Sequence, residues 1–172
     1  MKRVLFFALI SLIAGLLACV EKAPDQDAAR PAGQARKAER FVSKGDGTVT
    51  DTRTGLIWAA QDNGTDINWD SAKAYCENFS AGGYGDWRLP TIEELRSLYD
   101  PSQSRIAGCD SNPENWRIHI VPAVDLSCYW VWSSETPDAS SARYFLFDSG
   151  LNHPALRSYS FDGRVLPVRS SK

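Results

Sequence analysis

The chain has 172 residues, with 19 Lys and Arg, 21 Asp and Glu, and a formal net charge of −2. This weak acidity argues against a nucleic-acid-binding protein, because such proteins present a net basic face. All six Trp and all six Tyr lie after residue 40. Residues 41–172 therefore have the aromatic content and the length of one ordinary domain with a packed core.

The first 18 residues are typical of a bacterial lipoprotein signal peptide. A basic start precedes an almost entirely apolar segment, residues 4–17, which is too short for a comfortable membrane span. The segment ends in Leu-Leu-Ala-Cys, which resembles a lipobox in which Cys19 becomes the lipid-modified first residue of the mature protein. The alternative is an ordinary secretory signal in which Cys19 has no such role.

The residues after Cys19 predict where the protein is attached and how. Val20 rather than Asp follows the cysteine, which favours the outer membrane in a host that has one. Residues 19–40 lack aromatic side chains and are rich in Ala, Pro, Gln and charge, as is typical of a flexible tether. The predicted organisation is a signal peptide over 1–18, a lipid-anchored tether over 19–40 and a domain over 41–172.

The first part of the domain predicts a hairpin followed by a helix. Residues 41–60 are expected to form a β-hairpin, because strand-like runs flank a turn rich in Asp, Thr and Gly. A helix is predicted from Asn68, a good N-cap, to about Phe79. One helical face carries an apolar stripe that is expected to be core rather than a ligand site, namely Trp69, Ala72, Tyr75, Cys76 and Phe79.

A glycine-rich turn at residues 82–85 then leads into a second helix. Pro90 keeps the residue before it out of the helical conformation. Thr91 is predicted to begin a helix over residues 91–99, and Glu94 stands at the position that completes a capping box. Because so many local signals agree, this turn and helix are expected to be structural.

The remainder of the domain is predicted to be a long loop followed by short strands. Residues 101–126 are rich in Pro, Asn, Asp and Ser and are expected to be mainly loop. Strands are predicted over 129–133, 143–147 and 164–169. A hairpin, two helices, a loop and then several strands is an α+β order.

Three cysteines remain after Cys19, and in an exported protein two of them are expected to pair. Cys109 and Cys128 flank the loop-like stretch, whereas Cys76 lies on the predicted helix and fits a buried free thiol. Pairing of Cys76 with either of the others stays open. No metal site is expected, because there is no Cys-x-x-Cys and the two histidines, His119 and His153, are isolated.

Several blocks of the domain form a recognisable set: residues 46–51, 54–58, 69–78, 82–98, 129–134 and 165–169. The set resembles the Lcl C-terminal domain family over essentially all of residues 41–172, and the block Asp-Trp-Arg-Leu-Pro-Thr at 86–91 is highly specific. The resemblance implies a C-type-lectin-like fold with two helices, a small twisted and mostly antiparallel sheet and a long irregular loop region. It also implies a surface or secreted adhesive module, some of whose relatives bind sulfated polysaccharides.

The sequence departs from that family in ways that matter. Relatives often carry, near the end, a cysteine that pairs with the cysteine of the first helix, and Pro167 stands at that position here. The departure implies that Cys76 has no partner and favours a disulfide between Cys109 and Cys128. Calcium-type lectins use Glu-Pro-Asn or Gln-Pro-Asp with Trp-Asn-Asp, and none of these triplets occurs in this chain. Calcium-dependent sugar binding by that route is therefore not supported.

The leading hypothesis is a non-enzymatic binding module of the cell envelope, without a cofactor. Aromatic faces suit sugar rings and Arg suits carboxylate or sulfate. The candidate ligand contacts are therefore Trp116, Tyr129, Trp130, Arg143 and Arg157. For each aromatic residue the alternative is core packing. Trp130 and Trp132 are expected to share one face of their strand.

Two further hypotheses compete with it. The lectin-like scaffold also serves oxidative sulfatase-activating enzymes, which need a reactive cysteine pair such as Cys109 and Cys128. A hydrolase could be assembled from Ser133, His153 and Asp148, but no nucleophile-elbow spacing accompanies them. The third hypothesis is a structural envelope lipoprotein whose partner is another protein.

Overall fold

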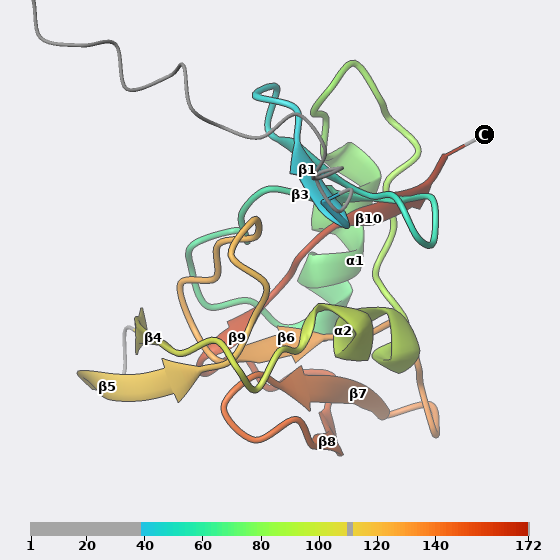
Figure 1. Cartoon of the computed structure of the whole chain (residues 1–172). Coiled ribbons are helices and arrows are strands. Elements are labelled where there is room, and N and C mark those ends of the chain that lie inside the picture. The colour runs from blue at the N-terminus through green and yellow to red at the C-terminus, as the bar shows by residue number, and fades with distance from the viewer. Residues whose placement is uncertain (1–38, 110–111, 172) are drawn as a thin grey trace, which may run out of the picture. The chain divides into compact units, whose positions relative to one another are not determined.

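The computed structural model describes residues 39–109 and 112–171. These residues form an α+β domain with three sheets and two helices, α1 (Trp69–Asn78) and α2 (Ile92–Leu98) (Figure 1). The strands, in chain order, are β1 (Phe41–Ser43), β2 (Thr48–Asp51), β3 (Leu56–Ala59), β4 (Arg105–Cys109), β5 (Asn112–Ile118), β6 (Trp130–Trp132), β7 (Ser141–Leu146), β8 (Asn152–Leu156), β9 (Gly163–Arg164) and β10 (Val168–Ser170).

The first sheet has the order β1-β2-β3-β10 and is antiparallel throughout. Its central pair, β2 and β3, is the predicted hairpin, and the end of the chain returns to lie beside β3. The turn before α2 joins this sheet, because Arg88 and Val168 exchange backbone hydrogen bonds of 2.9 and 3.0 Å. The sheet therefore ties the start, the middle and the end of the domain together.

A second four-stranded sheet, β8-β7-β6-β9, lies between the two helices. Its strands are antiparallel except for the parallel pair β6 and β9. The face that carries Trp130 and Trp132 packs with the buried side of α1, and the face that carries Val131 and Phe145 packs with the buried side of α2. Both faces of β6 are buried, which is why a strand of three residues can hold two large tryptophans.

Both helices begin where the sequence predicts. The side chain of Asn68 accepts a hydrogen bond from the N–H of Ser71 at the start of α1. At the start of α2, Thr91 accepts from the N–H of Glu94 at 3.2 Å, and the Glu94 carboxylate accepts from the N–H of Thr91 at 2.8 Å. This reciprocal pair is the capping box, and it satisfies two donors that a helix start otherwise leaves open.

The prediction of a mainly irregular segment over residues 101–126 is wrong in its first half, where β4 and β5 form a two-stranded antiparallel sheet. In β4 the small Ala107 and Cys109 point inward, while Ile106 and Gly108 are exposed. The buried positions of β4 therefore carry small residues and its one large apolar residue is exposed, which is the reverse of the usual strand pattern. The resemblance implies one small sheet, whereas the described residues form three. Sequence analysis also predicted no strand at β8, because Pro154 and His153 give it little strand signal.

The signal peptide, Cys19 and most of the tether lie outside the described residues. Within the described part, neither helix is long and apolar enough to cross a membrane.

Candidate functional site

A groove of about 270 Å³ lies along β6, β7 and β8 and the segment that follows β8. None of its lining side chains carries a formal charge, and four of them are aromatic. We call it the aromatic groove, lined by Tyr129, Trp130, Tyr144, Leu146, Ala155, Leu156 and Tyr159.

Trp130 lies at the centre of this groove. Its ring centroid is 4.3 Å from that of Tyr144 and 5.1 Å from that of Tyr159, and the Tyr159 ring stacks on it at 30°. Trp130 is only 5% exposed, whereas Tyr159 is 46% exposed and Phe161, next to it, is 62% exposed. Large exposed aromatic side chains that continue a buried cluster are typical of an interaction site rather than of core packing.

The indole N–H groups of the tryptophans fall into two groups. Trp69 donates to the carbonyl of Ser133 at 2.7 Å, and Trp132 donates to the carbonyl of Ile67 at 2.9 Å. Among the described residues, the buried indole nitrogens without a hydrogen-bond partner belong to Trp58, Trp116 and Trp130. Of these three tryptophans, Trp130 lines the aromatic groove, and its buried N–H has no hydrogen-bond partner there.

The phenols of the groove remain protonated at neutral pH. Burial, together with the negative charges of Asp162 and Asp148, raises the pKa of Tyr129 to about 12. Burial and the neighbouring Tyr159 also raise the pKa of Tyr144. The hydroxyl groups can therefore both donate and accept hydrogen bonds, while the charges that act on the groove are negative.

The three predicted aromatic contacts lie together. Trp116, from β5, stacks on Tyr129 with the ring centroids 4.3 Å apart and the planes at 26°. Tyr129 and Trp130 both line the aromatic groove. Sequence analysis weighed core packing against ligand contact for each of them; all three pack on other aromatic rings, and Tyr129 and Trp130 also line the groove.

Arg143, a predicted ligand contact, does not point into the groove. It follows Ala142 and precedes Tyr144 on β7, and successive side chains of a strand point to opposite faces. Tyr144 lines the groove, so Arg143 faces the other side, where its Nη1 donates to Oδ1 of Asn152 at 3.0 Å.

Arg157, the other predicted cation, is held against the start of α1. Its guanidinium lies over the Trp69 ring, 4.3 Å from the centroid, and its Nη2 pairs with the carboxylate of Asp70. Nη1 also donates to the carbonyl of Ala139 at 3.2 Å. The structure therefore separates the two predicted arginines from the predicted aromatic contacts.

Sequence analysis missed five residues that line the groove, namely Tyr144, Leu146, Ala155, Leu156 and Tyr159. A signal for Tyr159 was present, since residues 157–161 place Tyr and Phe among serines in a segment without strand or helix pattern. Apolar rings in a polar loop are exposed unless the loop folds back. No comparable local signal marks Tyr144, whose role depends on the pairing of β7 with β6.

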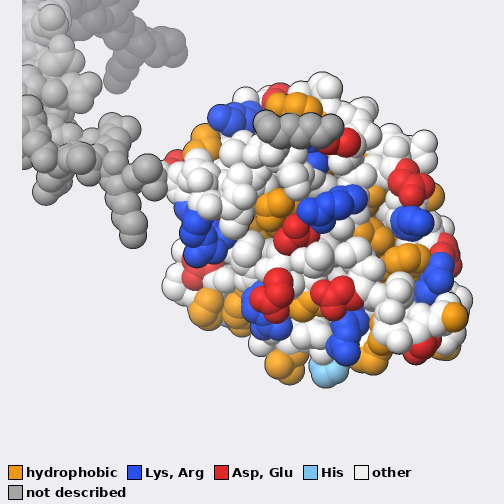
Figure 2. Space-filling model, turned by 90° about the vertical axis from the view of Figure 1, so that its right-hand side faces the viewer, with side chains coloured by type: hydrophobic (Ala, Val, Ile, Leu, Met, Phe, Trp, Pro, Cys, Tyr) orange, Lys and Arg blue, Asp and Glu red, His pale blue; other side chains and the backbone are white. Residues whose placement is uncertain are grey.

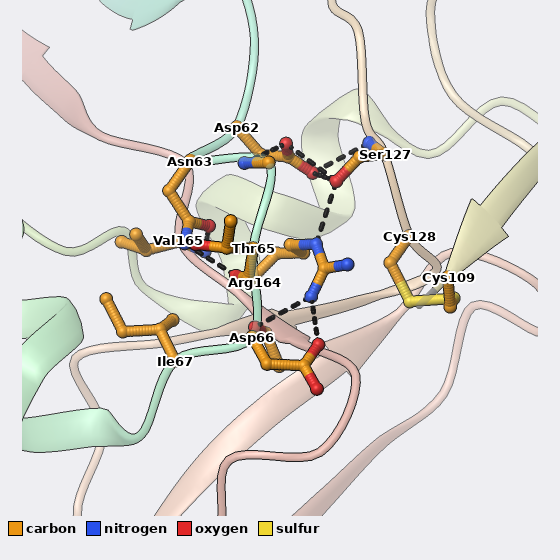
Figure 3. A network of polar contacts seen from close by, with 12 residues as sticks. Asp62, Asn63, Thr65, Asp66, Ile67, Cys109, Ser127, Cys128, Arg164 and Val165 are labelled. Carbon is orange, nitrogen blue, oxygen red and sulfur yellow. Dashed lines mark hydrogen bonds and ion pairs between the residues drawn. A yellow bond between two sulfur atoms is a disulfide. The ribbon is translucent and has the colours of Figure 1, made fainter. Parts of the chain in front are cut away.

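A buried arginine of β9, Arg164, is the centre of a network of polar contacts (Figure 3). Arg164 is fully buried, and it donates to Oγ of Ser127 at 2.8 Å and to Asp66 at 2.5 Å. Ser127 in turn donates from its backbone N–H and its hydroxyl to Asp62. Burial raises the pKa of Asp62 despite these donors and the charge of Arg164. The network joins the segment before α1, which carries Asp62 and Asp66, to Ser127 and to Arg164 of β9.

The residue before Arg164, Gly163, has no room for a side chain. A Cβ there would meet the carbonyl oxygen of Ile67 at 2.8 Å and Nε1 of Trp132 at 2.9 Å. These distances are shorter than real Cβ atoms allow, so any side chain at position 163 would push β9 away from β6.

The cysteines adopt the arrangement that the sequence favours. Cys109 and Cys128 form a disulfide with their Cα atoms 4.8 Å apart, and Cys76 is a buried free thiol. Burial, with the nearby charge of Glu77, raises the pKa of Cys76 to about 12, so the thiol is protonated at neutral pH. Asp162 lies close to the disulfide sulfurs, but disulfide sulfur is not the thiolate that binds metal ions.

The serine considered for hydrolysis is not exposed. Ser133 is fully buried, its Oγ donates to the carbonyl of Arg143 at 3.0 Å, and the same oxygen accepts from the N–H of Glu135 at 3.3 Å. These bonds hold the chain where it leaves β6, and the hydroxyl that would attack a substrate is buried.

A second groove, of about 560 Å³, runs between α1 and the turn before α2. We call it the turn groove, lined by Trp69, Lys73, Glu77, Trp87, Arg88, Leu89, Thr91 and Ser134. Arg88 donates from Nη1 and Nη2 to the two carboxylate oxygens of Glu94, at 2.8 and 2.7 Å. Its charge is therefore already matched within the fold.

Charges of both signs are interspersed on the surface. On the face shown in Figure 2, Lys and Arg side chains alternate with Asp and Glu, and no large area of one sign stands out. That face therefore offers no basic patch to a polyanion.

These features define an α+β domain with an uncharged aromatic groove along β6, β7 and β8 and with a network of polar contacts that hold the fold. The model of the Lcl C-terminal domain matches residues 47–169, and the chain therefore belongs to that family. A comparison with curated proteins finds no match.

Proposed function

We propose that this protein is a non-catalytic lipoprotein of the cell envelope whose C-type-lectin-like domain binds glycans through the aromatic groove. The observation that carries the proposal is the stack of Tyr159 on Trp130, beside Tyr144, in an open groove. Aromatic faces pack on the apolar faces of sugar rings, while the phenol and indole groups supply hydrogen bonds to hydroxyls. The two helices pack on opposite faces of the sheet β8-β7-β6-β9, an arrangement compatible with the lectin-like fold.

The test is binding of the purified protein to a panel of neutral and sulfated oligosaccharides, with and without calcium. Saturable binding that does not require calcium supports the proposal. A folded protein that binds no carbohydrate on the panel contradicts it.

The anchor is a separate part of the proposal. If Cys19 carries the lipid, Cys19→Ser should move the protein from the membrane fraction to the soluble fraction, because multiple acyl chains hold a protein firmly on a bilayer. Cell fractionation with an antibody to the domain measures this. Retention of Cys19→Ser in the membrane fraction would exclude lipidation at Cys19 as the anchor. In a host with two membranes, we expect the wild type in the outer one.

A protein partner is the second candidate, and the exposed apolar side chains beside the groove favour it. Leu156 and Phe161 are 60% and 62% exposed, more than a sugar-binding groove needs. Cross-linking in intact cells through a photoreactive residue at position 161 would support this function if it yields one defined partner that Tyr159→Ala abolishes.

A further inference from the structure

We infer that the aromatic groove selects uncharged sugar rings and excludes sulfated or carboxylated ones, with Tyr159 and the Trp130 N–H as the determinants. This inference rests on the proposed function and specifies its ligand class. It differs from what the family resemblance implies, because some relatives bind sulfated polysaccharides.

The charges around the groove argue against an anionic ligand. The groove lining contains no Lys or Arg. Arg143 lies on the other face of the sheet, and Arg157 is held by Asp70 and Trp69. A sulfate needs a cation or several N–H donors to replace its hydration, and the described lining offers one unpartnered buried N–H, that of Trp130.

Two carboxylates act on Tyr129, in one wall of the groove. The carboxylates of Asp162 and Asp148 are close enough to Tyr129 to raise its pKa. Asp148 keeps a buried oxygen, Oδ1, that has no hydrogen-bond partner among the described residues. An anionic group beside Tyr129 would therefore meet negative charge at short range, where screening by salt is weak.

The shape and the hydrogen-bonding groups suit a neutral pyranose. About 270 Å³ is near the lower end of the roughly 300–1,000 Å³ typical of ligand pockets, so one ring fits better than a folded partner. The Tyr144 and Tyr159 hydroxyls can donate or accept, and the buried Trp130 N–H has no acceptor. A hydroxyl of a neutral sugar can supply that acceptor without bringing a charge into the groove.

Tyr159 forms the most exposed aromatic part of the groove lining. Its ring covers Trp130 and is half-exposed, and its segment has no strand or helix. Close by, Asp162 has a positive φ of 59°, which is uncommon for a residue other than glycine. A small shift of Tyr159 would let a sugar ring stack beside it and reach the Trp130 N–H.

The experiment compares two kinds of probe on one set of variants of the full-length protein. The neutral probes are oligomers of glucose and of N-acetylglucosamine, and the anionic probes are heparin and dextran sulfate, each in low and in physiological salt. The variants are Tyr159→Ala, Tyr159→Phe and Trp130→Phe. Tyr84→Ala is the matched control, because Tyr84 is also a half-exposed tyrosine, 39% exposed, but lies outside the groove.

The expected result is binding to a neutral oligomer with little dependence on salt. Tyr159→Ala should weaken it by about tenfold, which is the loss of one aromatic stack. Tyr159→Phe keeps the ring and should retain most of the affinity. Trp130→Phe removes the N–H and should weaken binding by about three- to tenfold, while Tyr84→Ala should bind like the wild type.

Four outcomes overturn the inference in distinguishable ways. Heparin binding that Tyr159→Ala abolishes keeps the groove as the glycan site but reverses its selectivity. Neutral binding that Tyr159→Ala leaves unchanged keeps the glycan function and places it elsewhere. No carbohydrate binding at all contradicts the proposed function itself. A dimer that Tyr159→Ala dissociates would identify the occupant of the groove as a second copy of the chain.

Discussion

The turn groove and the aromatic groove both have a tryptophan in their walls, but they differ in how their polar groups are used. In the turn groove the N–H of Trp87 donates to the carbonyl of Tyr84 at 3.0 Å, and Arg88 is matched by Glu94. In the aromatic groove the N–H of Trp130 has no partner and Tyr159 is half-exposed. The first groove is the larger one, so size does not identify the binding site.

If the aromatic groove is the binding site, as we propose, spare interaction capacity marks a site better than a motif does. The residues over 86–91 are the most specific feature of the sequence, but their donors and acceptors hold the fold. A ligand there would have to compete with the Arg88–Glu94 pair. In the aromatic groove a ligand of the proposed kind would have no ion pair to break, although Tyr159 would have to shift on Trp130.

Replacement of Trp87 should have the largest effect. Trp87 is 4% exposed and packs edge-on against Phe79 with the ring centroids 5.1 Å apart. Trp87→Ala should lower the free energy of unfolding by about 3–5 kcal/mol, as for other large buried side chains. Urea unfolding measures this. A variant of normal stability that has lost ligand affinity would move the binding site to the turn groove.

Removal of the disulfide should have the next largest effect. Cys109 and Cys128 close a loop with a sequence separation of 19, for which the chain-entropy model gives about 3 kcal/mol. The bond also anchors the hairpin whose Trp116 stacks on Tyr129. The double variant with Ser at both positions should therefore unfold at lower urea concentration and bind more weakly. If it unfolds like the wild type, the reduced hairpin must be held by packing alone.

The Arg88–Glu94 pair should contribute less. Arg88→Met keeps the aliphatic part of the side chain but leaves the half-buried Glu94 without its cation. Because hydrogen bonds to charged groups contribute roughly 1.5–3 kcal/mol, the free energy of unfolding should fall by about 2 kcal/mol. Lys73→Met, on the exposed part of the same groove, is the control and should change stability by less than about 0.5 kcal/mol. Equal effects of the two would show that the pair adds nothing specific.

Acid should reveal the same pair in another way. Burial alone would raise the pKa of Glu94, but the hydrogen bonds from Arg88 and Thr91 outweigh it and lower the pKa. The unfolded chain then takes up its proton at higher pH than the folded one, so this stability is present above the ordinary glutamate pKa, about 4.3, and is lost as the pH falls through the lowered value. The difference in unfolding free energy between wild type and Arg88→Met should therefore shrink with acidification. A difference independent of pH would mean that Glu94 does not depend on Arg88.

Local signals predicted part of the fold well. Asn68, Thr91 and Glu94 act through bonds to residues three positions away, so their effect can be read in sequence. The hairpin of β2 and β3 and the order of helices and strands follow from similar short-range patterns. The β4–β5 hairpin was not predicted in this way, because its inward positions Ala107 and Cys109 are small and its outward Ile106 is exposed, so the segment lacks the pattern of large apolar residues that marks a strand.

The candidate site was predicted only in part, for a physical reason. Tyr129 and Trp130 were identified because aromatic residues cluster in sequence there. Arg143 and Arg157 were nominated from composition, but which way Arg143 points depends on its strand position relative to Tyr144, and Arg157 is captured by Asp70, 87 residues away. Partners at such separation leave no local trace.

The smallest effect is expected at the groove itself, and it completes the comparison. Tyr159 is half-exposed and its ring contacts are with Trp130 and with the exposed Phe161, so Tyr159→Ala should change the free energy of unfolding by no more than about 0.5 kcal/mol. Urea unfolding of this variant beside Trp87→Ala measures the contrast directly. A loss as large as that of Trp87→Ala would mean that the stack on Trp130 is part of the core, and the aromatic groove would then have no interaction capacity to offer a ligand.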